Sequence, residues 1–284
     1  LNVGQNGGPC AIWAHCADSV LIQYCEAYNN RTNGAADGGA FDFDGGVSNS
    51  VIQYCYSHDN DGAGYLMWNY EQAPHKLNNN TIRYSLSVND GRKHSYAGFH
   101  LGTSGLPITN IYIYNNTVIT SAAVTGLPRG IWTGGSTPNE HIYFYNNLIV
   151  TDGKAPLAEI EQSEKDIVFN GNAYWCSGNK FLLKYSTKTY TSFGEWRKAE
   201  KQEESTGVFA DPKLTWLSSE KPAGNLRNLK QLKAFRLQKT SPLRQKGINL
   251  NDLHMQVPSQ DMWGNTIPLN QKPDIGAYQF PVKQ

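Results

Sequence analysis

The chain has 284 residues, of which 17% are charged, and its formal net charge at pH 7 is +1. A nearly neutral chain lacks the positive field that nucleic-acid binding requires, so we expect no nucleic-acid partner. No run of 18 apolar residues occurs, which excludes a helical membrane span. Abundant glycine and tyrosine fit one elongated secreted domain.

A strand-like motif recurs five times in the first half of the chain, at intervals of 30, 30, 30 and 31 residues. A constant period means that each repeat stacks on its neighbours to bury its apolar face. No helical apolar period occurs between residues 1 and 150, so we predict an all-β fold, a right-handed parallel β-helix with coils of about 30 residues. The repeats share a tyrosine at one position: Tyr24, Tyr54, Tyr84, Tyr114 and Tyr145.

Equivalent positions in successive coils should form columns, ~4.8 Å apart along the axis. The position after the tyrosine predicts a ladder of small polar side chains at a coil corner: Cys25, Cys55, Ser85, Asn115 and Asn146. Three residues further on, a second column is predicted to face the core: Tyr28, His58, Val88, Val118 and Ile149. His58 is therefore interpreted as a hydrogen-bonded core histidine rather than a catalyst.

Beyond residue 150 the period fails. One more strand-like segment, residues 167–174, follows at a spacing of 25, and Ser192 with Glu195 forms a capping box that predicts a short helix. We expect β-helix coils over residues 1–176, with N-terminal coils missing from this chain. Residues 177–284 should pack along the coils and close the end of the β-helix, because an open end exposes unpaired strand edges.

Three features carry a resemblance to a known family. They are the Asn-Asn corners of the repeats, the Trp196 segment followed by Ala210-Asp-Pro212, and the ending Asp274-Ile-Gly-Ala-Tyr278. Over essentially the whole chain, the sequence resembles secreted bacterial right-handed parallel β-helix proteins of the pectate-lyase-like superfamily. The resemblance implies a monomeric, carbohydrate-active protein that is secreted, periplasmic or on the cell surface. It does not choose among hydrolases, lyases, esterases and binding proteins on this fold.

The strongest candidate site follows the first long glycine-rich turn. In Phe41-Asp42-Phe43-Asp44 the side chains alternate, so both carboxylates point outward if both phenylalanines enter the core. The two aspartate Cα atoms would lie ~6.6 Å apart, near the carboxyl separation of an inverting glycosidase. Each carboxylate raises the pKa of the other, which can keep one protonated as a general acid. A polar outer face and a structural calcium site are the alternatives.

The neighbouring coils should add residues to the same outer face. The predicted catalytic residues are Asp42 and Asp44, with help from Asp61 or Glu71. The predicted substrate-binding residues are Asp37, Trp13, Trp68, Arg92, Lys93, His100 and Trp132. The phase of one strand stays open, because Met67 faces outward in one alignment and Trp68 in an alignment shifted by one residue.

Three functions fit these residues. The first is a glycoside hydrolase acting on a plant or algal polysaccharide or oligosaccharide without a cofactor. The second is a polysaccharide lyase in which Asp37, Asp42 and Asp44 hold calcium, and Lys93 or Arg92 is the base. The third is a carbohydrate-binding β-helix without catalysis.

Overall fold

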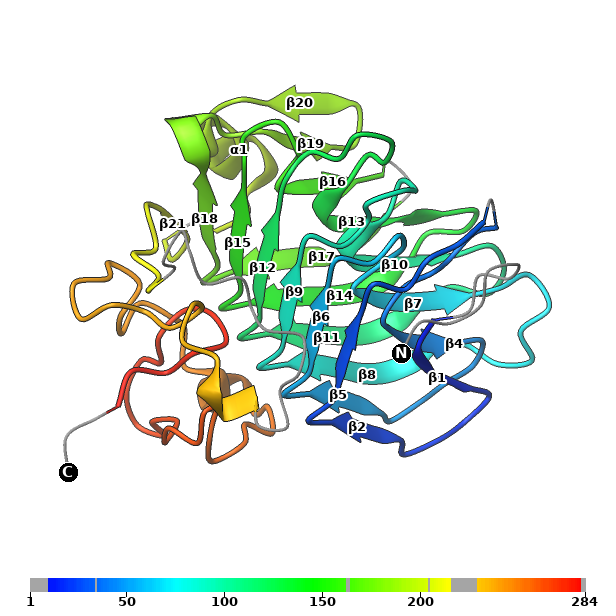
Figure 1. Ribbon diagram of the computed structural model, residues 1–284, viewed down its shortest axis with the longest axis horizontal. Helices are drawn as coiled ribbons and strands as arrows, with labels where there is room; N and C mark the ends of the chain where they lie inside the picture. Colours follow the sequence, from blue (N-terminus) through cyan, green and yellow to red (C-terminus); the bar gives the residue numbers. More distant parts are fainter. Residues whose placement is uncertain (1–9, 34, 162–163, 204, 216–228, 282–284) are drawn as a thin grey trace.

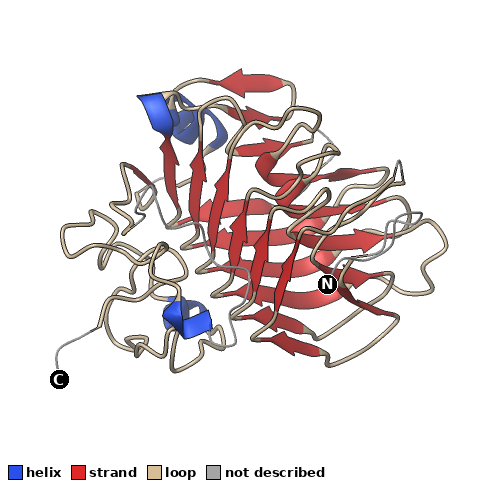
Figure 2. Ribbon diagram, viewed as in Figure 1, coloured by secondary structure: helices blue, strands red, loops and turns tan. Residues whose placement is uncertain are grey.

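A computed structural model describes residues 10–33, 35–161, 164–203, 205–215 and 229–281. The chain forms a parallel β-solenoid of about five turns, built from three parallel sheets. Figure 1 shows the strands of successive turns stacked beside one another, and Figure 2 shows the loops that join them. The predicted β-solenoid with turns of about 30 residues is confirmed.

Each turn contributes one strand to each sheet. Sheet A contains β1 (Ile12–His15), β4 (Phe41–Asp44), β7 (Tyr65–Asn69), β10 (Ala97–Thr103), β13 (Arg129–Gly135), β16 (Ala158–Ile160) and β19 (Leu183–Tyr185), followed by antiparallel β20 (Lys188–Tyr190). Sheet B contains β2 (Leu21–Gln23), β5 (Val51–Gln53), β8 (Asn78–Arg83), β11 (Thr109–Tyr114), β14 (Glu140–Tyr145) and β17 (Ile167–Asn170). Sheet C contains β3 (Glu26–Tyr28), β6 (Tyr56–His58), β9 (Leu86–Val88), β12 (Thr117–Thr120), β15 (Leu148–Thr151), β18 (Ala173–Cys176) and β21 (Val208–Phe209).

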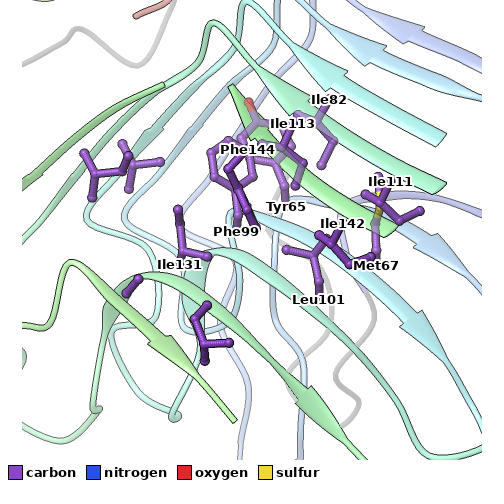
Figure 3. Packing of buried hydrophobic residues seen from close by; sticks show 14 of the residues in the cluster. Tyr65, Met67, Ile82, Phe99, Leu101, Ile111, Ile113, Ile131, Ile142 and Phe144 are labelled. Carbon is purple, nitrogen blue, oxygen red and sulfur yellow. The ribbon is translucent and has the colours of Figure 1, made fainter. Parts of the chain in front are cut away.

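The core fills the space enclosed by the three sheets. Apolar side chains alternate inward along each strand and stack on their equivalents one turn away (Figure 3). The ring of Tyr65 lies between Phe41 and Phe99, with centroid distances of 5.3 and 5.2 Å. Phe144 stacks on Phe169 in the same way, at 4.7 Å. This column packing fixes the register between turns, and with it the face to which every outward residue belongs.

The corner between sheets B and C corrects the predicted register. Each corner residue has a left-handed backbone, and these residues are Tyr24, Tyr54, Tyr84, Asn115 and Asn146. Tyr114 therefore pairs with Arg83 rather than with Tyr84, because the step from the third to the fourth turn is 31 residues at this point. The small polar ladder continues from Ser85 to Asn116 and Asn147, not to Asn115 and Asn146. Because Tyr84 and Tyr114 are 30 residues apart like the earlier pairs, the tyrosine spacing does not reveal this one-residue shift in strand pairing.

The buried ladder ends on a carboxylate. Backbone N–H groups donate to the side-chain oxygen of the next turn, through Asn116, Asn147 and Asn172 in order. The Asn172 backbone N–H then donates to Glu203 at 3.1 Å. Burial raises the pKa of Glu203 to about 7. Backbone N–H groups at this sharp corner have no strand partner, and the ladder supplies their hydrogen bonds.

The predicted core position of His58 is wrong. Sheet C directs Ala27, which belongs to the core cluster, inward, so the alternation places Tyr28 and His58 on its outer side. There the His58 ring lies between Tyr28 and Tyr56, and its nitrogens bond to Glu26 at 3.1 Å and Asp59 at 2.9 Å. In the first three turns the left-handed corner residue is the tyrosine, whereas in the next two turns it is the asparagine that follows. The same count from the tyrosine therefore reaches the outer side of sheet C in the first three turns and the core in the next two.

The C-terminal part closes one end of the solenoid and lines its side. Helix α1 (Phe193–Glu200) begins at Ser192, which accepts a hydrogen bond from the Glu195 N–H, as the capping box predicts. Its fully buried Trp196 packs on Phe169 and Tyr174 at the end of the core. The 3-10 turns are Ser177–Asn179, Leu229–Gln231 and Leu250–Leu253. Sheets A and C extend past residue 176 through β19 and β21.

Residues 229–281 form a layer of loops along the outer side of sheets B and C, drawn in orange and red in Figure 1. Their backbone carbonyls accept hydrogen bonds from several turns. Tyr54 donates to Gln260 at 2.8 Å, Tyr114 donates to Gln256 at 2.8 Å, and Asn146 donates to Ile248 at 2.9 Å. Across the described ranges, no helix has the length and hydropathy needed to cross a membrane.

Candidate functional site

The outward residues of sheet A form two columns, which we call the sheet A face. The first column holds Trp13, Asp42, Leu66, His100, Trp132 and Glu159. The second column holds His15, Asp44, Trp68, Gly102 and Gly134. Met67 belongs to the core, so the shifted alignment, with Trp68 outward, is correct.

Asp42 and Asp44 both face outward because Phe41 and Phe43 are fully buried in the core. Asp42 is only 6% exposed, and its Oδ1 atom has no hydrogen-bond partner among the described residues. Burial, with smaller contributions from the charges of Asp44 and Asp37, raises the pKa of Asp42 well above its usual value. Asp42 therefore holds a proton at pH values where an exposed aspartate is ionised.

Asp44 is more exposed than Asp42. Burial raises the pKa of Asp44, and the charge of His15 and a hydrogen bond from the Gly45 N–H oppose that rise. His15 lies beside Asp44 across the β1–β4 pair and is held by Tyr70, whose hydroxyl lies 2.7 Å from the His15 Nε2 atom. The two carboxyl groups of β4 thus have different environments, a neutral buried one and one that contacts solvent.

A third carboxylate approaches from the turn before β4. Asp37 has a left-handed backbone, and its Oδ1 atom accepts a hydrogen bond from the Tyr96 hydroxyl at 3.0 Å. Burial raises the pKa of Asp37. Cys10 lies near these acids, and burial followed by the charges of Asp42 and Asp37 raises the pKa of its thiol. Cys10, Leu66 and Tyr96 belong to one apolar cluster on this face.

Three aromatic rings cover the other half of the sheet A face. His100 stacks on Trp132 with a centroid distance of 4.2 Å, and Trp68 lies 6.1 Å from His100 and 6.2 Å from Trp132. A Cβ atom at Gly102 would lie 2.7 Å from Trp68 and 2.9 Å from Trp132, so glycine makes room for both indoles. Burial, followed by the charge of Arg129, lowers the pKa of His100 to about 3. His100 is therefore a neutral ring inside an aromatic stack.

The remaining predicted residues are occupied elsewhere. The carboxylate of Asp61 accepts hydrogen bonds from the Arg31 guanidinium at 3.1 Å and the Thr32 N–H at 2.8 Å. Arg92 donates to two backbone carbonyls, at 2.7 and 2.8 Å, and Lys93 donates to the carbonyl of Thr32. These three side chains hold loops at a corner. Glu71 is exposed in the turn after β7.

The structure thus brings together Asp37, Asp42, Asp44, Trp13, Trp68, His100 and Trp132 on the sheet A face. Sequence reasoning missed Cys10, His15, Tyr70 and Tyr96. The alternation that places Trp13 outward also places His15 outward, so this residue had a readable signal. Tyr70 and Tyr96 lie in loops, where no periodicity reports their direction.

Carboxylates near one another raise the question of a metal ion. Within the described ranges, no group of three or more His, Cys, Asp or Glu side chains is arranged to hold one. Asp37, Asp42 and Asp44 therefore do not converge on a common point as calcium ligands would.

No protein-family model matches this chain, and no curated protein matches it.

Proposed function

We propose that this chain is a carbohydrate-active β-helix protein of the pectate-lyase-like kind, and that the sheet A face is a glycoside hydrolase site. The substrate would be a plant or algal polysaccharide or oligosaccharide outside the cell. The observation that supports this most strongly is the pair of carboxyl groups on β4. Asp42 is buried with a raised pKa, and Asp44, two residues away on the same face, is more exposed.

The two groups suit different steps of hydrolysis. Asp42 as the protonated acid donates its proton to the leaving glycosidic oxygen, and Asp44 as the base accepts a proton from the attacking water. The Cα atoms of Asp42 and Asp44 are separated by two strand rises, ~6.6 Å, which leaves room for a water molecule near an inverting geometry. The sugar carbon gains a hydroxyl group and the leaving sugar gains the proton, so the reaction consumes one water.

The aromatic residues extend this site along the solenoid axis. Trp13 lies one strand from Asp42 and is 52% exposed. Trp132 lies three strands away on the other side, ~14 Å by the strand spacing. Aromatic faces pack against the C–H faces of sugar rings, so these positions suit sugar units on either side of the cleaved bond.

A non-catalytic glycan-binding protein is the second candidate. The low exposure of Asp42 favours it, because a general acid must reach the leaving oxygen and Cys10, Leu66 and Tyr96 pack over this part of the face. In this case the aromatic stack of Trp68, His100 and Trp132 would bind a sugar chain without cleaving it.

Incubation of the protein with a panel of plant and algal glycans, with products read by mass spectrometry, separates these functions. Hydrolysis adds one water to each cleaved bond, whereas elimination by a lyase adds none. Asp42→Asn and Asp44→Asn should each lower kcat by about 10²- to 10⁴-fold. Asp166→Asn, which changes an exposed aspartate just before β17, serves as the matched control and should retain full activity.

Products without added water would refute hydrolysis. Unchanged cleavage by Asp42→Asn would refute the assignment of the acid. If a glycan binds to the wild type and to Asp42→Asn with equal affinity and no glycan is cleaved, the binding function replaces the hydrolase.

A further inference from the structure

A groove of about 390 Å³ lies between the outer side of sheet B and the C-terminal segment. The groove is lined on the sheet side by Val51, Thr81, Arg83 and Tyr112. On the other side it is lined by His254 of the C-terminal segment. The strands β5, β8 and β11 and the orange loops beside them can be followed in Figure 1. These residues belong to sheet B, so the groove is separate from the sheet A face.

One aromatic face is open to this groove. Thr81, Tyr112 and Tyr143 pair in register on three successive turns. The Tyr112 ring stacks on Tyr143 with a centroid distance of 5.2 Å and an interplanar angle of 15°. The opposite face of the Tyr112 ring is directed toward Thr81, whose side chain is too small to cover it. Thr81 and Tyr112 both line the groove at this step of the column.

Polar groups surround this aromatic face. The exposed amides of Asn49 and Asn79 bond to each other at 2.6 Å and line the groove. Arg83 donates through Nε to Gln53 at 2.8 Å, and through Nη1 to Tyr114 at 2.8 Å and to the Gln256 carbonyl at 2.6 Å. Among the described residues, no carboxylate lies within ion-pair distance of Arg83. The groove thus combines a ring face with amide and guanidinium donors, held in place by hydrogen bonds.

We propose that this groove binds a short oligosaccharide of two or three sugar units. One ring packs its C–H face on Tyr112 and lies over Thr81 and Val51. Its hydroxyl groups bond to the Asn49 and Asn79 amides, and the Arg83 guanidinium donates hydrogen bonds to sugar hydroxyl or carboxylate oxygens. Because the groove lies on sheet B, this binding is independent of the carboxylates of β4.

Titration calorimetry with cellotriose, xylotriose and trigalacturonate tests the proposal. We expect at least one of these probes to bind the wild type. Thr81→Tyr continues the aromatic stack in register and fills the groove from a surface position, so it should abolish binding at the groove, but not at the sheet A face, without disturbing the core. Tyr112→Ala should weaken binding at least tenfold.

Tyr143→Ala is the matched control. It removes the same side chain from the same column and breaks the same stacking contact, but Tyr143 does not line the groove. It should bind within about twofold of the wild type. The proposal is overturned if none of the three probes binds at 10 mM, if Thr81→Tyr retains the wild-type affinity, or if Tyr143→Ala and Tyr112→Ala lose affinity equally.

Discussion

Replacing Asp42 by asparagine should make the protein more stable at neutral pH, and the gain should depend on pH. The carboxyl group of Asp42 is buried without a partner for Oδ1 and has a pKa raised well above the usual 3.8. Above pH 3.8 the unfolded chain loses this proton while the folded chain keeps it, so the folded state binds more protons. Stability then falls as pH rises until the folded-state pKa is reached.

The magnitude follows from linkage. While Asp42 stays protonated in the folded state, each pH unit above 3.8 costs about 1.36 kcal/mol of stability. Between pH 5 and pH 7 the wild type should therefore lose stability relative to Asp42→Asn, by up to about 2.7 kcal/mol when the proton is kept over the whole range. Asparagine has nearly the shape of a protonated aspartate and cannot ionise, so the substitution removes the titration and leaves the packing similar.

Urea unfolding of both proteins at pH 5, 6 and 7, followed by circular dichroism, measures this difference. The exposed Glu71→Gln control should show the same pH dependence as the wild type. If the stability difference between the wild type and Asp42→Asn is the same at pH 5 and pH 7, then Asp42 is ionised in the folded state. The assignment of Asp42 as a proton donor would then fail as well.

Two further predictions concern the polar groups that support the turns. Burial alone would lower the pKa of His58, but hydrogen bonds to Asp59 and Glu26 outweigh it and raise the pKa to about 9. The wild type should exceed His58→Gln in urea stability by up to about 3 kcal/mol below pH 6.5, with the difference lost as pH rises through 9; a difference that does not change with pH would contradict this. Asn147→Ala should cost about 3 kcal/mol or more, because it leaves the buried N–H of Asn116 and the carbonyl of Ile113 without their bonds. Exposed Asn270→Ala is its control, and equal losses of stability would argue against a special role of the buried ladder.

The sequence repeat was sufficient to predict the solenoid and the outward direction of part of the sheet A face. The outward direction of Asp42 and Asp44 could be predicted because phenylalanine occupies the alternate positions of the strand. When both phenylalanine rings are buried, both carboxyl groups must point to the other side. The columns containing Trp13, His100 and Trp132 followed from adding whole turns to that strand. Trp68 followed once the phase of β7 was known.

The failures occurred where a turn changes length. Tyr84 and Asn115 occupy the same left-handed corner position, and their dissimilar side chains conceal that the two turns differ by one residue. The count from tyrosine to core then placed His58 on the wrong side of sheet C. Arg92 and Lys93 carried the right chemistry for a sugar site, but Arg92 donates to the backbone of the next turn and Lys93 to the backbone two turns away. The sequence contains no signal for such a loop contact.

The C-terminal segment changes how the repeat array can come apart. In an ordinary solenoid each turn contacts only its nearest neighbours, so terminal turns can fray while the others persist. Here the C-terminal segment accepts hydrogen bonds from Tyr54, Tyr114 and Asn146, which belong to the second, fourth and fifth turns. Opening any one of these turns also loosens the contacts of the segment with the other two turns. The segment thus joins distant repeats into one cooperative unit, and amide exchange in these turns should approach a common rate.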